Sequence, residues 1–302
     1  MQLTRKLRTT VICLAALAVA ASGLSTASEA QAAGPPGVPA SSAKYTVPIT
    51  KMQGGTTDGS SVYFAEVTKV SETVSTTYLY KCPKLASNPS CKRSATAIAG
   101  KVNGMTYDAG RKQLVLAIQG KPTARYYTTD LKPVLFTNAT PAVAVFPVTL
   151  AAICVPPTLG IYAAGSGPNG YRAYTVMPSG APRYDSNIVK PVSGYSGISS
   201  GALATIAGQY GTDWQSLGCT NSLIYTIRTN SSHSWVITFT WTGAVPDVYP
   251  LCATGKAQSD GCTTWIADEA ENLFVLDGKV YVGFNAKSGN DYYMQFAGIP
   301  LA

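Results

Sequence analysis

The acidic residues are the first place to look for chemistry, because glycoside hydrolysis needs two carboxyl groups, one of which is a proton donor with a raised pKa. The densest group is the run 268–271, in which Asp268, Glu269 and Glu271 are the candidate acid and partner carboxylates. The other acids considered are Asp58, Asp108, Asp185 and Asp213. An acidic run in a loop is usually a solvated surface, so hydrolysis by these residues is the second interpretation of the chain.

A serine motif is the next candidate. Gly197-Ile198-Ser199-Ser200-Gly201 matches G-x-S-x-G, and Asp213 and His233 follow in the chain order of an α/β-hydrolase triad. That motif needs a strand, a sharp turn and a helix within a mostly parallel sheet, whereas hairpin strands and Gly/Ser turns flank it here. The sequence therefore predicts a turn around Ser199 and a solvated loop around His233, without catalysis.

The sequence offers no metal or cofactor motif. It has no Cys-x-x-Cys pattern, and its single histidine has no zinc-ligand spacing around it. A calcium loop and a glycine-rich phosphate loop are also missing from the sequence. We therefore expect neither a metal nor a cofactor.

Aromatic residues favour binding instead. The chain has 18 tyrosines and four tryptophans among many small polar residues. Flat amphipathic rings beside short hydrogen-bonding groups suit the recognition of sugars or proteins. Most of these rings are expected to pack in the core. Trp214 and Trp265 stand in loop-like contexts and are the candidates for a binding rim.

A repeated pattern of strands predicts the scaffold that positions these side chains. Five blocks of β-branched or aromatic residues each follow a turn signal, at intervals of 47 to 63 residues. The blocks are Val62-Tyr63-Phe64-Ala65, Leu114-Val115-Leu116-Ala117, Ile161-Tyr162-Ala163-Ala164, Ile224-Tyr225-Thr226-Ile227 and Val280-Tyr281-Val282-Gly283. A second aromatic strand follows each block, so the pattern predicts a β-hairpin that occurs five times.

Repeated hairpins predict an all-β fold, a β-propeller of five or six blades of antiparallel strands, over residues 44–302. The alternative is one or two β-sandwich domains. Residues 45–49 are expected to complete the last blade and close the ring. The only helical pattern covers residues 200–209.

The N-terminal residues predict export. Residues 1–32 have the positive start, apolar run and Ala-Gln-Ala cleavage site of a signal peptide, and residues 33–43 form a Pro- and Gly-rich flexible linker. We expect a secreted protein, periplasmic in a Gram-negative bacterium, without a later transmembrane segment. Removing the leader takes three of 23 basic residues and one of 15 acidic ones, which leaves a net charge of +6. There is no basic stripe or motif for nucleic acid.

Six cysteines remain after cleavage, and an even number in an exported chain favours three disulfides. Cys82 with Cys91 and Cys252 with Cys262 flank short loops, so local pairing is the simplest choice. Cys154 and Cys219 remain, and both precede the strand block of their repeat at a similar distance. Equivalent strands of adjacent blades lie side by side, so we predict that this third pair bridges two neighbouring blades.

Two Asn-x-Ser/Thr sequons, at Asn138 and Asn230, predict N-glycan sites in a eukaryotic secretory pathway. Together, the export signal, the cysteine count, the aromatic residues and the weak catalytic motifs indicate a secreted, non-enzymatic binding protein for a glycan or an extracellular protein. A secreted glycosidase and a structural component of the cell surface or envelope are the alternative functions.

Overall fold

A computed structural model describes most of the chain after residue 44. The described residues are 45–47, 51–69, 74–84, 89–135, 140–166, 169–176, 189–195, 197–211, 213–229, 234–245, 247–251, 269–288 and 291–300. The chain divides into two units, Met1–Ala33 and Gly34–Ala302. All of the described residues belong to the second unit, so the predicted signal peptide and linker lie outside them.

Within these residues, all strand pairs are antiparallel and form five sheets. Sheet 1 contains β2 (Met52–Thr57), β3 (Ser61–Lys69), β4 (Ser75–Pro83), β5 (Lys92–Arg93) and β6 (Ile98–Ala99). Sheet 2 contains β7 (Val102–Asp108), β8 (Gln113–Ile118), β9 (Lys121–Thr128) and β10 (Val143–Leu150). Sheet 3 contains β11 (Ala152–Cys154), β12 (Ile161–Gly165), β13 (Tyr171–Thr175) and β14 (Lys190–Pro191).

Sheet 4 contains β15 (Asp213–Cys219), β16 (Leu223–Thr229), β17 (Ser234–Thr240) and β18 (Val248–Leu251). Sheet 5 contains β19 (Glu269–Leu276), β20 (Lys279–Ser288), β21 (Asp291–Pro300) and the N-terminal β1 (Tyr45–Val47). The sequence predicts five or six blades. The described residues form four sheets of the regular four-stranded kind, and sheet 1 departs from it because β6 also pairs with β4.

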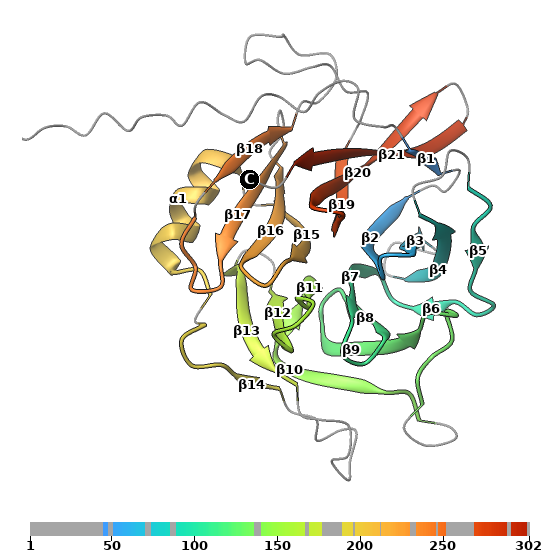
Figure 1. Ribbon diagram of the computed structural model, residues 1–302, viewed down its shortest axis with the longest axis horizontal. Coiled ribbons are helices and arrows are strands. Elements are labelled where there is room, and N and C mark those ends of the chain that lie inside the picture. Colours follow the sequence, from blue (N-terminus) through green and yellow to red (C-terminus); the bar gives the residue numbers. More distant parts are fainter. Residues whose placement is uncertain are drawn as a thin grey trace, which may run out of the picture. The chain divides into compact units, whose positions relative to one another are not determined.

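The first strand of each hairpin lies at the centre. β2 contacts β7, β7 contacts β11, β11 contacts β15, β15 contacts β19, and β19 contacts β2, so these five strands close a ring. In Figure 1 the other strands of each sheet extend outward from that ring. β1 pairs with β21 in sheet 5, with Tyr45 opposite Phe296, as the sequence predicts for closure. The all-β propeller prediction is confirmed.

The strand blocks are apolar without alternation because both of their faces are buried. In β3, Val62 and Phe64 pack against Phe274 and Tyr281 of sheet 5. Their neighbours in sequence, which include Tyr63, point to the other face and pack against sheet 2. Successive side chains of a strand point to opposite faces, so each sheet fills two interfaces with its neighbours.

The innermost strands approach one another closely. A Cβ on Gly104 of β7 would lie 2.7 Å from the Cα of Ala152 in β11, so only glycine fits there. Gly54 has a φ of +50° at the bulge of β2, where the register with β3 shifts between Gln53 and Gly55. Such a bulge bends the strand and increases its twist where the ring is tightest.

The predicted helix is confirmed as α1 (Ser200–Tyr210), which contacts sheet 4 where the ring of Tyr210 packs edge-on against Trp235 of β17. Ser199 of the G-x-S-x-G motif is its N-cap, and its Oγ accepts a hydrogen bond from the backbone N–H of Ala202 at 3.2 Å. The motif serine therefore begins a helix, while His233 lies outside the described residues.

Two predicted disulfides are confirmed. Cys82 pairs with Cys91 across a short loop, with Cα atoms 4.3 Å apart. Cys154 at the end of β11 pairs with Cys219 at the end of β15, with Cα atoms 5.9 Å apart. The long-range bond thus joins the innermost strands of two adjacent sheets. The prediction for Cys252 and Cys262 falls outside the described residues.

Candidate functional site

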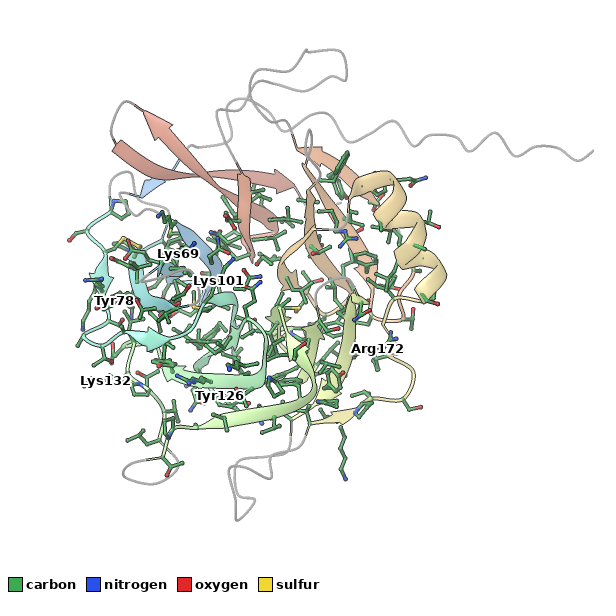
Figure 2. All side chains as sticks on the ribbon, turned by 180° about the vertical axis from the view of Figure 1, so that it is seen from behind. Lys69, Tyr78, Lys101, Tyr126, Lys132 and Arg172 are labelled. Atoms are coloured by element: carbon green, nitrogen blue, oxygen red, sulfur yellow. A yellow bond between two sulfur atoms is a disulfide. The ribbon has the colours of Figure 1, made fainter. Side chains whose placement is uncertain are left out.

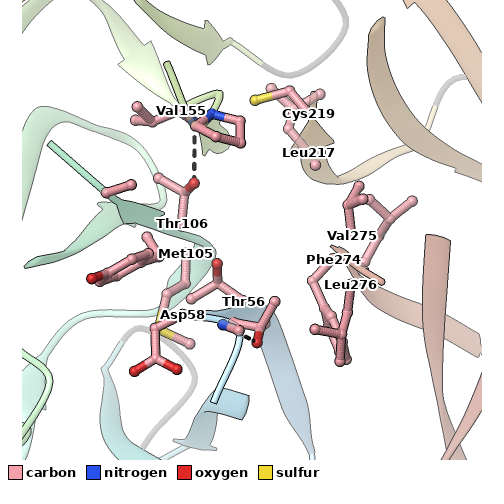
Figure 3. A pocket seen from close by; sticks show the side chains of 18 of the residues that line it. Thr56, Asp58, Met105, Thr106, Val155, Leu217, Cys219, Phe274, Val275 and Leu276 are labelled. Atoms are coloured by element: carbon pink, nitrogen blue, oxygen red, sulfur yellow. Dashed lines mark hydrogen bonds between the residues drawn. The ribbon is translucent and has the colours of Figure 1, made fainter. Parts of the chain in front are cut away.

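A pocket of about 300 Å³ lies where the innermost strands end. Its walls are the last residues of β2, β7, β15 and β19, with Val155 and Pro157 after β11. Figure 3 shows side chains from these different strands facing a common space. All five sheets contribute to this one pocket. Its volume is at the lower end of the range for ligand pockets.

The pocket combines apolar walls with polar groups. Met105, Leu217 and Phe274 are each at most 2% exposed and form part of the apolar wall. The polar side chains that line it are Thr56, Thr57, Asp58, Thr106, Tyr107 and Asp277. A few convergent polar groups on an apolar surface are typical of a small-ligand site.

Asp58 follows β2 and is held by its own turn. Its Oδ1 accepts hydrogen bonds from the backbone N–H groups of Ser60 and Ser61, at 2.8 and 2.7 Å. Its Oδ2 accepts from the hydroxyl of Tyr63 at 2.6 Å. Burial raises the pKa of this carboxyl, but the hydrogen bonds from Tyr63, Ser61 and Ser60 outweigh it, so the pKa of Asp58 lies below its ordinary value.

Asp277 occupies the corresponding turn of sheet 5. Asp277 and Gly278 have φ angles of 49° and 70°, which is the positive-φ pair of a two-residue hairpin turn between β19 and β20. The Asp277 carboxylate lies 2.6 Å from the ammonium nitrogen of Lys84, which follows β4 in sheet 1. Sheets 1 and 5 are therefore joined by an ion pair at the pocket.

Further bonds between sheets fix the pocket wall. The hydroxyl of Thr106 in β7 accepts a hydrogen bond from the backbone N–H of Val155 at 3.0 Å, drawn in Figure 3. The Asn221 side chain, after β15, accepts one from the backbone N–H of Thr158 at 3.1 Å. The Cys154–Cys219 disulfide links the same two sheets, and Cys219 lines the pocket. The wall is thus held in place without a ligand.

A buried polar network stands beside the pocket. Asp108, which is 3% exposed, is the last residue of β7 and lies between two residues that line the pocket. Its Oδ2 lies 2.8 Å from the Arg111 guanidinium and accepts a short hydrogen bond from the Tyr162 hydroxyl of sheet 3. Burial, followed by the charges of Tyr126 and Asp108, raises the pKa of Tyr162 well above its ordinary value. The network ties sheet 2 to sheet 3.

Of the candidate catalytic acids, Glu271 lies away from the pocket lining. Glu271 is in β19, at the bulge between Ala270 and Asn272, and is only 6% exposed. The expectation that this run is a solvated loop is therefore wrong for Glu271, which the fold buries between sheets. Glu269 begins β19, and Asp268 lies outside the described residues. Glu271 is not among the described residues that line the pocket.

One candidate binding tryptophan lies in a strand. Trp214 lies in β15, opposite Arg228 of β16, and not in a loop as its sequence context suggests. The strand extends further than its flanking polar residues indicate. Trp265 and the two sequons at Asn138 and Asn230 fall outside the described residues. The sequence did not indicate four residues that line the pocket, namely Thr56, Thr57, Thr106 and Tyr107. The only feature of the sequence that marks them is their position at the end of the first strand of a hairpin.

In the part of the chain that the structure describes, no three His, Cys, Asp or Glu side chains form a group that could hold a metal ion. Two oxygens on the innermost strands, Gln53 Oε1 and Ser216 Oγ, are buried without a hydrogen-bond partner among these residues. They lie one or two positions before the residues that line the pocket.

None of the described residues belongs to an apolar helix long enough to cross a membrane.

No family model matches the chain, and no curated protein matches it in sequence. Comparison with solved structures gives matches with low TM-scores. The WD40 domain of Toxoplasma gondii coronin is 13% identical, with 88% of this chain and 67% of that chain covered, at a TM-score of 0.35. The β-propeller domain of Swd1 from Myceliophteria thermophila is 8% identical, with 84% and 74% covered, at a TM-score of 0.38.

A structural genomics protein from Bacteroides thetaiotaomicron is also 8% identical, with 83% of this chain and 70% of that chain covered, at a TM-score of 0.42. All three TM-scores are below 0.5, so these similarities say nothing about a ligand. The propeller assignment rests on the strand pairing and the closed ring of innermost strands.

Proposed function

We propose that this chain is a secreted, non-catalytic binding protein, built as a propeller of five blades in which sheet 1 is the irregular one. Its ligand group, a sugar residue of a glycan or a side chain of a protein partner, enters the axial pocket. The observation that carries this proposal is the pocket itself, which residues of all five sheets line and in which hydroxyls and two carboxylates from sheets 1, 2 and 5 stand beside an apolar wall. A wall already fixed by bonds between sheets loses little conformational freedom when it binds a ligand.

The state of the pocket acids supports binding over glycoside hydrolysis. A glycosidase needs a general acid whose pKa is raised, whereas the pKa of Asp58 is lowered by its hydrogen bonds. Asp277 is held by Lys84 at 2.6 Å. The carboxylate of Asp58 is therefore better suited to accept a hydrogen bond than to donate a proton.

Secretion is part of the same proposal. Disulfides form and persist mainly in oxidising compartments, and the described residues contain two of them. The predicted leader at residues 1–32 agrees with that location.

The test compares wild type with a blocked pocket on a glycan array and a panel of glycoside substrates. Ala109 is exposed at the pocket, so Ala109→Trp should fill its mouth without disturbing the core. Ala97→Trp, an exposed position between β5 and β6, is the matched control. We expect saturable binding that Ala109→Trp abolishes and Ala97→Trp retains. Binding that survives Ala109→Trp, or turnover of a glycoside by wild type, would contradict the proposal.

A further inference from the structure

The positive charge of the chain is concentrated in one third of it. Residues 51–132, which form sheet 1 and most of sheet 2, contain twelve basic and five acidic residues, a net +7. The other residues after the predicted leader contain eight basic and nine acidic residues, a net −1. The excess charge of the whole domain therefore belongs to two neighbouring sheets.

Four of these lysines stand at the end opposite the pocket. Lys51 directly precedes β2 and Lys101 directly precedes β7, so both lie where innermost strands begin. Lys69 is the last residue of β3, and Lys121 is the first of β9. Because β3 runs antiparallel to β2, and β8 to β7, these positions also fall at that end. We call Lys51, Lys69, Lys101 and Lys121 the lysine row.

Backbone bonds show that the row is continuous within sheet 1 and across to sheet 2. The carbonyl of Lys51 accepts a hydrogen bond from the N–H of Val67 at 3.1 Å, two residues before Lys69. Lys69 pairs with Ser75 of β4, and the carbonyl of Ser75 accepts a hydrogen bond from the N–H of Gly100 at 2.9 Å. Lys101 follows directly. Lys69 and Lys101 are labelled in Figure 2.

The same arrangement then repeats in sheet 2. The carbonyl of Lys101 accepts a hydrogen bond from the N–H of Gln119 at 2.8 Å, two residues before Lys121. Sheets 1 and 2 thus each have one lysine directly before the innermost strand. A second lysine lies two residues after the residue whose N–H bonds to the carbonyl of the first. Adjacent strands are about 4.8 Å apart, so one or two strand spacings separate the backbones of successive lysines of the row, which is comparable to the screening length of about 8 Å at physiological salt.

The charges of the row have no carboxylate partner among the described residues. Lys51, Lys69 and Lys121 are exposed and Lys101 is half-buried. The described ion pairs involve other cations, namely Lys81, Lys84, Arg93 and Arg111. Four neighbouring ammonium groups repel one another in the free protein, and an anionic partner relieves that repulsion.

We propose that the lysine row is a binding surface for an anionic polysaccharide, separate from the axial pocket. Lysine is a compact point charge without the bidentate fork of arginine, and it suits carboxylate or sulfate groups whose orientation varies along a polymer. The neighbouring Ser75 and Gln119 offer hydrogen bonds to hydroxyl groups. Proteins that bind single-stranded nucleic acid stack its bases on aromatic rings, and the row itself supplies only lysines. Val74, 50% exposed, is the large apolar side chain beside the row, too little for an amphipathic membrane surface.

The test uses heparin and polygalacturonate as anionic probes, with dextran as the neutral one. The row variant is K51Q/K69Q/K101Q/K121Q. Its matched control is K92Q/K112Q/K132Q/K279Q, which removes the same charge from four exposed lysines at the pocket end that form no described ion pair. Circular dichroism and thermal melting establish that both variants fold.

We expect wild type to bind an anionic probe, with a dissociation constant that rises with salt, and to ignore dextran. The row variant should lose at least about 30-fold in affinity and the control less than about 3-fold, since a lysine near an anionic surface contributes about fivefold.

Equal losses in the two variants, or no binding by wild type at about 0.05 M salt, would overturn the proposal, because either result denies the row a special role. Tighter binding of single-stranded DNA or of phosphatidylserine vesicles than of either polysaccharide would also overturn it. Ala109→Trp should leave heparin binding unchanged, so this surface and the proposed pocket function can fail independently.

Discussion

The two ends of the innermost strands carry charge in different ways. At the end where β2, β7 and β19 finish, Asp58, Asp108 and Asp277 are each bonded to a turn, a tyrosine or a cation. At the end where β2 and β7 begin, the lysine row meets no described carboxylate. The carboxylates at the first end are bonded within the protein, whereas the lysines of the row at the second have no described carboxylate partner.

The difference follows from the local backbone. A short hairpin turn brings an Asp side chain within reach of its own N–H groups, as at Asp58, and the next sheet supplies a further partner, as Lys84 does for Asp277. A lysine at a strand end has a long flexible stem, and its ammonium stays in water unless a carboxylate is placed nearby. Substitutions at the two ends should therefore affect different properties.

The largest effect on stability is expected for the disulfide at the pocket end. Removing it with C154A/C219A should lower the free energy of unfolding by about 4 kcal/mol in the chain-entropy model, because it closes 65 residues. The C82A/C91A variant opens a separation of only 9 residues and should lose about 3 kcal/mol. Urea denaturation under non-reducing conditions measures both. A smaller loss for C154A/C219A than for C82A/C91A would deny the long-range bond its role in joining the sheets.

The next largest effect separates the two ends directly. Asp108→Asn removes the partner of Arg111 in a buried network and should cost about 3 kcal/mol. Lys101→Gln at the other end should change stability by less than about 0.5 kcal/mol. Both values come from urea denaturation at pH 7. The contrast between the ends would be broken if the two substitutions had equal effects.

A smaller effect concerns acid stability. The folded-state pKa of Asp58 is lowered, so its contribution is complete above the ordinary pKa of 3.8 and is lost as the pH falls below it. Asp58→Asn should lower the free energy of unfolding by about 1 kcal/mol at pH 7, since the Tyr63 hydroxyl loses a charged acceptor. Its melting temperature should also fall less steeply than that of wild type as the pH is lowered. Thermal melting between about pH 6 and pH 2.5 measures this. Parallel declines in the two proteins would contradict it.

The smallest expected effect lies on the outer part of sheet 1, where a cation does have a partner. Glu66 lies 3.9 Å from Arg93 and accepts a hydrogen bond from the Tyr80 hydroxyl at 2.8 Å. Burial, followed by that bond to Glu66, raises the pKa of Tyr80 to about 12. A raised pKa gives stability that is complete below the ordinary value of 10.0 and is lost as the pH rises toward 12.

Tyr80→Phe should therefore lower the free energy of unfolding by less than about 1 kcal/mol at pH 7. Between pH 10 and pH 12, the free energy of unfolding of this variant should fall less than that of wild type. Denaturation curves at several alkaline pH values test it. An unchanged alkaline decline would show that Tyr80 does not titrate as its surroundings indicate.

Much of the fold follows from local pattern. The blocks at Val62, Ile161 and Ile224 locate second strands because β-branched and aromatic residues after a turn fit a sheet buried on both faces. The pairing of Cys154 with Cys219 follows from their similar offsets in adjacent repeats. These features depend on period and spacing, which a sequence carries directly.

The site was not predictable in the same way. Thr56, Thr106 and Leu276 meet at the pocket only because the ring closes and the bulges set which residues stand at each strand end. The burial of Glu271 likewise depends on the bulge of β19. The members of the lysine row recur with the repeat, since Lys101 follows Lys51 by 50 residues and Lys121 follows Lys69 by 52. That they form one surface depends on the hydrogen bonds between strands.

The most direct test of the central contrast is the acetylation rate of each lysine in the native protein, measured by mass spectrometry with and without heparin. We predict that Lys51, Lys69 and Lys121 react faster than Lys84, whose ammonium is held by Asp277, and that heparin protects the row but not Lys112 or Lys132. If Lys84 reacts as fast as the row, or if heparin protects both ends alike, the two ends do not differ as described.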